Sequence, residues 1–160
     1  TSTTLAQLWK QEIPGFETLR DGQMSDNAEH ARALGFVDAR DGLILDEERI
    51  LQPAIARARA LADGGWTPPE PAMLSVAGAT ALGRLEEQLQ ESAAAGQITA
   101  HDATVGRALA RVVCGGGGDG PVSEQCLLEL EREAFLQLCG TEATRARIAH
   151  MLDTGQPLRN

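Results

Sequence analysis

The chain has 160 residues, of which 42% are apolar and 23% are charged, and its formal net charge is −9. This length suffices for one domain with a single core, whereas the acidic balance argues against nucleic-acid binding and against docking on anionic lipid, because both depend on clustered Lys and Arg. The sequence has no run of 18 apolar residues and therefore predicts no membrane-spanning helix.

Aromatic residues make up only 3% of the chain, with two Trp, three Phe and no Tyr. A core of this composition must consist of Leu, Ala, Val and Ile, which favours closely packed helices over a sheet enriched in aromatic and β-branched residues. We therefore predict an all-α fold, arranged as a multi-helix array with a compact C-terminal bundle.

The first part of the chain contains several short helical patterns. A helix is predicted over residues 4–11, ending before a break at 13–15, and a helical turn over 16–19. The next helix has Ser25 as its N-cap and ends at Gly35, which can adopt the left-handed conformation. Residues 43–45 are predicted to form a short extended segment. Asp46 can cap an Ala-rich helix over 47–62 that either starts near residue 52 or kinks at Pro53.

Residues 63–71 mark the clearest boundary, because two glycines followed by three prolines cannot continue a helix. Four helices are predicted beyond it, over 79–95, 100–113, 124–138 and 142–152. Thr99, Ser123 and Thr141 are expected to cap the last three. Helix 124–138 is the most apolar, so we expect it at the centre of the bundle. The predicted organisation is helices over 1–63, a Gly/Pro-rich strap over 64–78 and a helical bundle over 79–160.

The glycines at 115–118 are the one candidate phosphate-binding loop. A Walker loop requires a Lys and a following helix, and a dinucleotide-binding fold requires GxGxxG after a strand. Here a helix precedes the glycines, no Lys follows them, and Asp119 would repel a phosphate. We interpret the run as a flexible loop between helices.

The titratable side chains show no catalytic pattern. Three histidines lie in separate predicted helices without a second His or Cys at ligand spacing, and three cysteines form no CxxC pair, so neither a zinc site nor a disulfide framework is predicted. These residues are His30, His101, His150, Cys114, Cys126 and Cys139. Carboxylates four residues apart, such as Glu129 and Glu133, are typical of a solvated helix face.

Several strings are more specific than the composition. LEREAFL occurs at 130–136, HMLDTGQPLRN at 150–160 and ALARVVCGG at 108–116, while GFET occurs at 15–18 and GWTPP at 65–69. These strings resemble the C-terminal end of large bacterial 3-hydroxyacyl-CoA dehydrogenases that carry an enoyl-CoA hydratase/isomerase (crotonase-like) region. Trp66 stands where that family usually has Tyr. Residues 1–63 are then similar to the helices at the end of the crotonase-like region.

The resemblance implies that the chain is the C-terminal piece of a multidomain enzyme of fatty-acid β-oxidation, which would also explain the missing initiator Met. The parent would be cytoplasmic and would oxidise 3-hydroxyacyl-CoA with NAD. Its catalytic and NAD-binding residues would lie upstream, so we expect no catalytic, cofactor-binding or metal-binding residue here, only a structural or assembly role. Expected partners are the upstream domains, acyl-CoA through the parent, and a second copy in a homo-oligomer.

Two other functions stay open at this point. The chain could be an independent helical interaction module, which would expose a contiguous apolar patch larger than roughly a few hundred Å². It could also be a small metal- or thiol-dependent enzyme, provided that His101, Asp102 and a cysteine converge on one centre.

Overall fold

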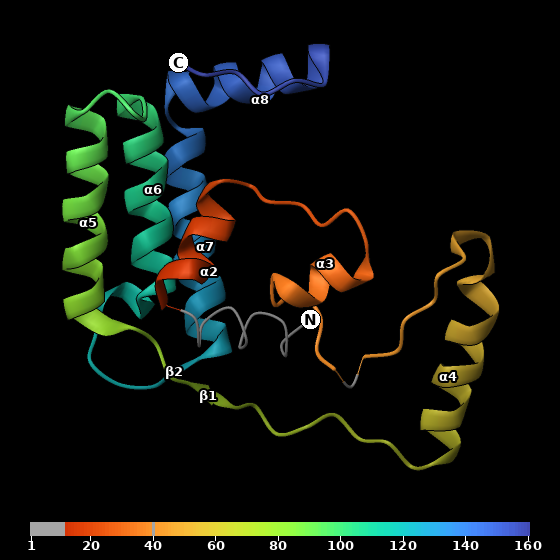
Figure 1. Cartoon of the computed structure of the whole chain (residues 1–160). Coiled ribbons are helices and arrows are strands. Elements are labelled where there is room, and N and C mark those ends of the chain that lie inside the picture. The colour runs from red at the N-terminus through yellow and green to blue at the C-terminus, as the bar shows by residue number, and fades with distance from the viewer. Residues whose placement is uncertain (1–11, 40) are drawn as a thin grey trace.

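The computed structural model describes residues 12–39 and 41–160, in which the regular secondary structure is almost entirely helical (Figure 1). The α-helices are α2 (Glu12–Arg20), α3 (Ala28–Ala33), α4 (Leu51–Asp63), α5 (Gly78–Ala94), α6 (Ala100–Val113), α7 (Glu124–Cys139) and α8 (Glu142–Thr154). Two 3-10 turns, η1 (Glu47–Arg49) and η2 (Gly115–Gly117), and two short strands, β1 (Met73–Leu74) and β2 (Val122–Ser123), complete the described elements. The predicted all-α fold class is confirmed.

Helix α6 lies at the centre of the bundle, since α5, α7, α2 and η2 all pack against it. Its inward residues Ala103, Gly106 and Ala110 are small and buried, and a Cβ on Gly106 would come within 2.6 Å of Leu89 Cδ2. Small side chains let neighbouring helices approach closely. On α7, only Leu127 is buried. The prediction that the most apolar helix is central is therefore wrong, because much of the apolar surface of α7 faces outward.

The core joins residues from three helices and the turn after α6. Phe16 of α2 packs with Leu85 and Leu89 of α5, with Ala110 and Val113 of α6, and with Cys114. Phe16 is 1% exposed. One of the few aromatic residues thus holds α2 onto the bundle, although α2 is far from α5 and α6 in sequence.

The predicted caps of the last three helices are confirmed. Thr99 and Asp102 form a reciprocal capping box at the start of α6, in which Thr99 accepts from the Asp102 amide and Asp102 accepts from the Thr99 amide. Ser123 accepts a hydrogen bond from the Cys126 amide, and Thr141 accepts one from the Thr144 amide. Each bond satisfies a backbone donor that has no partner within its helix.

The N-terminal predictions need more correction. Helix α2 runs through the predicted break at 13–15, and the predicted helix 4–11 lies outside the described residues. The N-cap of α3 is Asn27, which accepts from the His30 amide, and not Ser25. Gly35 does follow α3 with φ of +80°. Of the alternatives at Pro53, the later start is confirmed, because α4 begins at Leu51 and holds the proline in its first turn.

Between α4 and α5 the chain runs as a long extended strap (Figure 1). The strap ends in β1, which pairs antiparallel with β2 so that Met73 faces Ser123 and Leu74 faces Val122. The sequence pattern did not predict this pairing, since two-residue strands give no periodic signal. It joins the end of the strap to the start of α7.

None of the described helices has the length and apolar character needed to cross a membrane.

Candidate functional site

An apolar groove lies along the face shared by α6 and α7, with a volume of about 360 Å³. Its walls are almost wholly hydrocarbon, and α2 and β1 contribute to its edges. Its main lining side chains are Val105, Leu109 and Val112 of α6 with Leu127, Phe135 and Leu138 of α7.

The spacing of apolar residues along α7 forms one wall of the groove. Leu128 and Phe135 are seven residues apart and therefore share one face of that helix. Leu128 is 44% exposed and Phe135 is 60% exposed. Single exposed apolar residues are ordinary on a protein surface, whereas a continuous apolar groove marks a binding surface.

Charged residues from two helices also line the groove. Glu124 and Glu131, both on α7, line the groove together with Arg20 of α2. Arg20 Nε donates to Asp21 Oδ1 at 2.7 Å, and its guanidinium lies 5.9 Å from the centre of the Phe16 ring. The hydrogen bond to Asp21 raises the pKa of Arg20, so this side chain stays charged. An apolar occupant of the groove would thus meet carboxylates on α7 and a guanidinium on α2.

A second, more polar hollow of about 260 Å³ adjoins the groove, and Arg20 and Val105 line both. In it, Arg147 Nη2 of α8 donates to Asp102 Oδ1 of α6 at 2.7 Å, and Arg147 Nε donates to Asn160 Oδ1 at 2.7 Å. This network connects α6, α8 and the last residue of the chain. It uses much of the donor capacity of Arg147, which leaves that guanidinium little capacity for an external anion.

Two opposing effects act on Asp102. Partial burial alone would raise the pKa of its carboxyl group, but hydrogen bonds from the Thr99 amide and from Arg147, together with the Arg147 charge, outweigh burial and lower that pKa below its usual value. The carboxylate therefore caps α6 and pairs with α8 at the same time. These contacts give Asp102 a structural role.

The histidines and cysteines do not assemble into a reactive centre. His101 Nε2 lies 2.9 Å from Thr144 Oγ1 and so also links α6 to α8, while His30 contacts Asp26 at 3.2 Å beside the cap of α3. Cys114 is buried, and Cys126 and Cys139 are partly exposed. Within residues 12–39 and 41–160, no three His, Cys, Asp or Glu side chains are placed to hold a metal ion. A metal enzyme built on His101 and Asp102 has no support in that part of the chain.

The glycine run forms the turn η2, so its predicted position between two helices is confirmed, and the turn packs against α5, α6 and α7. Gly115, Gly116 and Gly117 have φ of +64°, +78° and +82°. A Cβ on Gly115 would come within 2.7 Å of Val76 Cγ2, and one on Gly117 would come within 3.0 Å of Leu82 Cδ2. The turn follows α6 and not a strand, so it differs from the strand, glycine turn and helix of a dinucleotide-binding fold.

Comparison with known proteins identifies one relevant similarity. The chain is 36% identical, over 149 residues, to a probable 3-hydroxyacyl-CoA dehydrogenase of Bacillus subtilis (strain 168), and the match covers 91% of the chain. The matched region is only 19% of that relative, so the chain spans about one fifth of its length. No family model matches the chain, and no solved structure matches it.

Proposed function

We propose that this chain is the C-terminal helical module of an NAD-dependent 3-hydroxyacyl-CoA dehydrogenase of fatty-acid β-oxidation, and that it serves structure and assembly without an active site of its own. In this proposal the parent enzyme is cytoplasmic, also carries a crotonase-like region, and binds NAD and acyl-CoA outside these 160 residues. The observation that carries the proposal is the 36% identity over 149 residues to the Bacillus protein.

The geometry supports a structural role in two ways. Two polar contacts hold helices together, namely the Asp102–Arg147 pair at 2.7 Å and the His101–Thr144 contact at 2.9 Å. The apolar groove, in contrast, is open and bordered by exposed Phe135 and Leu128. A surface of this kind is typical of a module that packs against another protein segment.

The test uses the Bacillus relative in three forms: intact, lacking the region that matches this chain, and with that region replaced by residues 1–160. We expect the intact enzyme and the chimera to be folded and to reduce NAD with a 3-hydroxyacyl-CoA, measured by NADH absorbance. The deleted form should fail to assemble, as judged by its size in solution. A deleted form that stays folded and fully active would contradict the structural role.

The chain by itself provides the complementary test. We expect no NADH formation from 3-hydroxyacyl-CoA and no NADH binding by fluorescence titration. Either activity in the isolated chain would show that the catalytic or cofactor-binding residues lie within it.

A further inference from the structure

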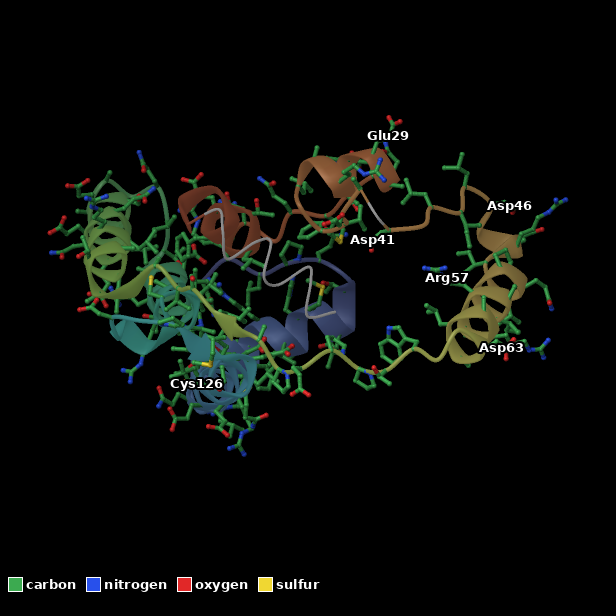
Figure 2. All side chains as sticks on the ribbon, turned by 90° about the horizontal axis from the view of Figure 1, so that it is seen from below. Glu29, Asp41, Asp46, Arg57, Asp63 and Cys126 are labelled. Atoms are coloured by element: carbon green, nitrogen blue, oxygen red, sulfur yellow. The ribbon has the colours of Figure 1, made fainter. Side chains whose placement is uncertain are left out.

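The described elements leave the α6–α7 groove uncovered. Phe135 and Leu128 of its α7 wall are 60% and 44% exposed. Helix α4 does not cover the groove, because its main contacts are with the η1 turn immediately before it. Figure 2 shows Arg57 and Asp63 of α4 far from Cys126 of α7. A groove of hydrocarbon side chains left in water is unfavourable, which favours an occupant.

Helix α2 runs beside the groove in a direction that its contacts fix. At the C-terminal end of α2, Arg20 lines the groove and shares the polar hollow with Asp102, at the start of α6. One turn earlier, Phe16 lies in the core together with Val113, at the end of α6. Helix α2 therefore runs antiparallel to α6 (Figure 1), and its first residue, Glu12, lies towards the end of α6.

The chain that precedes α2 has an apolar pattern suited to the groove. Residues 1–11 read TSTTLAQLWKQ and lie outside the described residues. Leu8 and Trp9 follow Leu5 by three and four residues, so a helix would present all three on one face. The segment contains no acidic residue, so no charge in it would repel Glu124 and Glu131 of the groove.

The connection to α2 brings this segment within reach of the groove. It joins α2 at the end of the groove where Leu74 of β1 and Glu124 at the start of α7 lie. Residues 10 and 11 are available for a reversal of the chain. As a helix, residues 4–9 would span about 9 Å, which fits within the roughly 11 Å along α7 from Leu128 to Phe135. A short covalent tether gives effective concentrations in the millimolar range, so this occupant is favoured over a separate partner.

We propose that residues 4–9 fold back into the α6–α7 groove of the same chain. Leu5, Leu8 and Trp9 then cover the α7 wall that Leu128 and Phe135 form. This inference names the protein segment that packs in the groove, but it rests on the groove and on the connection to α2, and not on the activity of the parent enzyme.

The experiment measures the fluorescence of Trp9 in the 160-residue chain. The chain has two tryptophans, and Trp66 is 58% exposed on the strap, so Trp66→Phe leaves Trp9 as the only emitter. We expect blue-shifted emission and slow quenching by acrylamide, both unchanged on dilution, because docking within one chain does not depend on concentration. Emission typical of exposed tryptophan overturns the proposal. Protection that is lost on dilution also overturns it, because the segment would then lie on another copy.

Groove variants in the Trp66→Phe chain test where Trp9 packs. Leu128→Asp and Phe135→Asp each place a carboxylate in the groove, and each should raise the quenching rate constant severalfold and shift the emission to the red. Leu136→Asp is the matched control, because Leu136 is on the same helix, is also 60% exposed and does not line the groove. It should leave Trp9 protected. Trp9 that stays protected in both groove variants, or that Leu136→Asp exposes, overturns the proposal.

Variants of the segment provide the reciprocal test. Leu5→Asp with Leu8→Asp should expose Trp9 as strongly as the groove variants do. Thr3→Asp with Gln7→Asp adds the same charge to the opposite face, since each position is about 200° of helical rotation from Leu5, and should leave Trp9 protected. Exposure of Trp9 by this control, or continued protection in the Leu5 and Leu8 variant, contradicts docking through the apolar face.

Far-UV circular dichroism verifies that each variant is folded. If a groove variant unfolds, Leu128→Ala with Phe135→Ala replaces it, because this pair removes apolar contacts without introducing a charge. The quenching rate constant should then rise by a smaller factor, and no rise at all would overturn the proposal.

Discussion

Gly106 is a residue at which packing outweighs helix propensity. A Cβ at this position would come within 2.6 Å of Leu89 Cδ2, and Leu89 is fully buried. Gly106→Val should therefore lower the free energy of unfolding by about 1–3 kcal/mol through overpacking, measured by urea denaturation.

Gly83 on α5 is the matched control, because a Cβ at this position would meet no atom within 4 Å and its φ is not positive. Gly83→Ala should raise stability by about 0.5–1 kcal/mol, since alanine loses less backbone entropy in a helix. Equal effects of the two substitutions would contradict close approach of α5 and α6 at Gly106.

Asp102 should make part of the stability depend on pH. Its pKa is lowered in the folded chain, so the ionised carboxylate stabilises the fold above the unfolded pKa of about 3.9. This contribution is lost as the pH falls through the lower, folded pKa.

Asp102→Asn should cost about 1 kcal/mol at pH 7, because the charge-assisted bond to Arg147 is lost. The difference from wild type, measured by urea denaturation, should shrink towards pH 3 and below. The exposed Glu87→Gln on α5 serves as the control and should change stability little at pH 7. A difference for Asp102→Asn that grows on acidification would contradict the assigned role.

At the scale of elements, the sequence predicts local structure better than packing. The caps at Thr99, Ser123 and Thr141 were predictable because a side chain three residues from its target amide is a local feature. The centre of the bundle was not, since apolar content does not tell whether a helix faces the core or an open groove. Leu127 is buried while Phe135 on the same helix is 60% exposed.

In the candidate site, too, the local structure was predictable from the sequence and the long-range packing was not. Helix α7 was predicted with its apolar residues, but the groove also needs Leu19 of α2 and Leu74 of β1, which long-range contacts bring to it. Likewise, pairing of Asp102 with Arg147 joins positions 45 residues apart, and no periodic pattern indicates such a partner.

The turn η2 gives a prediction at this scale. Gly115 has φ of +64° and a Cβ there would come within 2.7 Å of Val76, whereas Gly118 has φ of −81° and ample space. Gly115→Ala should destabilise the chain by about 1–3 kcal/mol, and Gly118→Ala should change stability by less than about 1 kcal/mol. Thermal denaturation of the two variants provides the comparison, and a tolerated Gly115→Ala would mean that the turn does not need its left-handed backbone.

At the scale of the whole molecule, stability should be distributed unevenly between the bundle and α4. The bundle has a shared core of Phe16, Leu85, Leu89, Ala110, Val113 and Cys114. Helix α4 has 13 residues and none of them is buried, and an isolated helix shorter than about 12–15 residues is only marginally stable in water. Amide protection should therefore differ strongly along one chain.

Hydrogen exchange with mass spectrometry measures this difference. In dilute solution, amides of α4 should exchange much faster than those of α6, because α4 opens without disturbing the core. Pro53→Ala is a useful companion variant, as it restores an amide in the first turn of α4 without altering the bundle. Protection of α4 equal to that of α6 would contradict this division of stability.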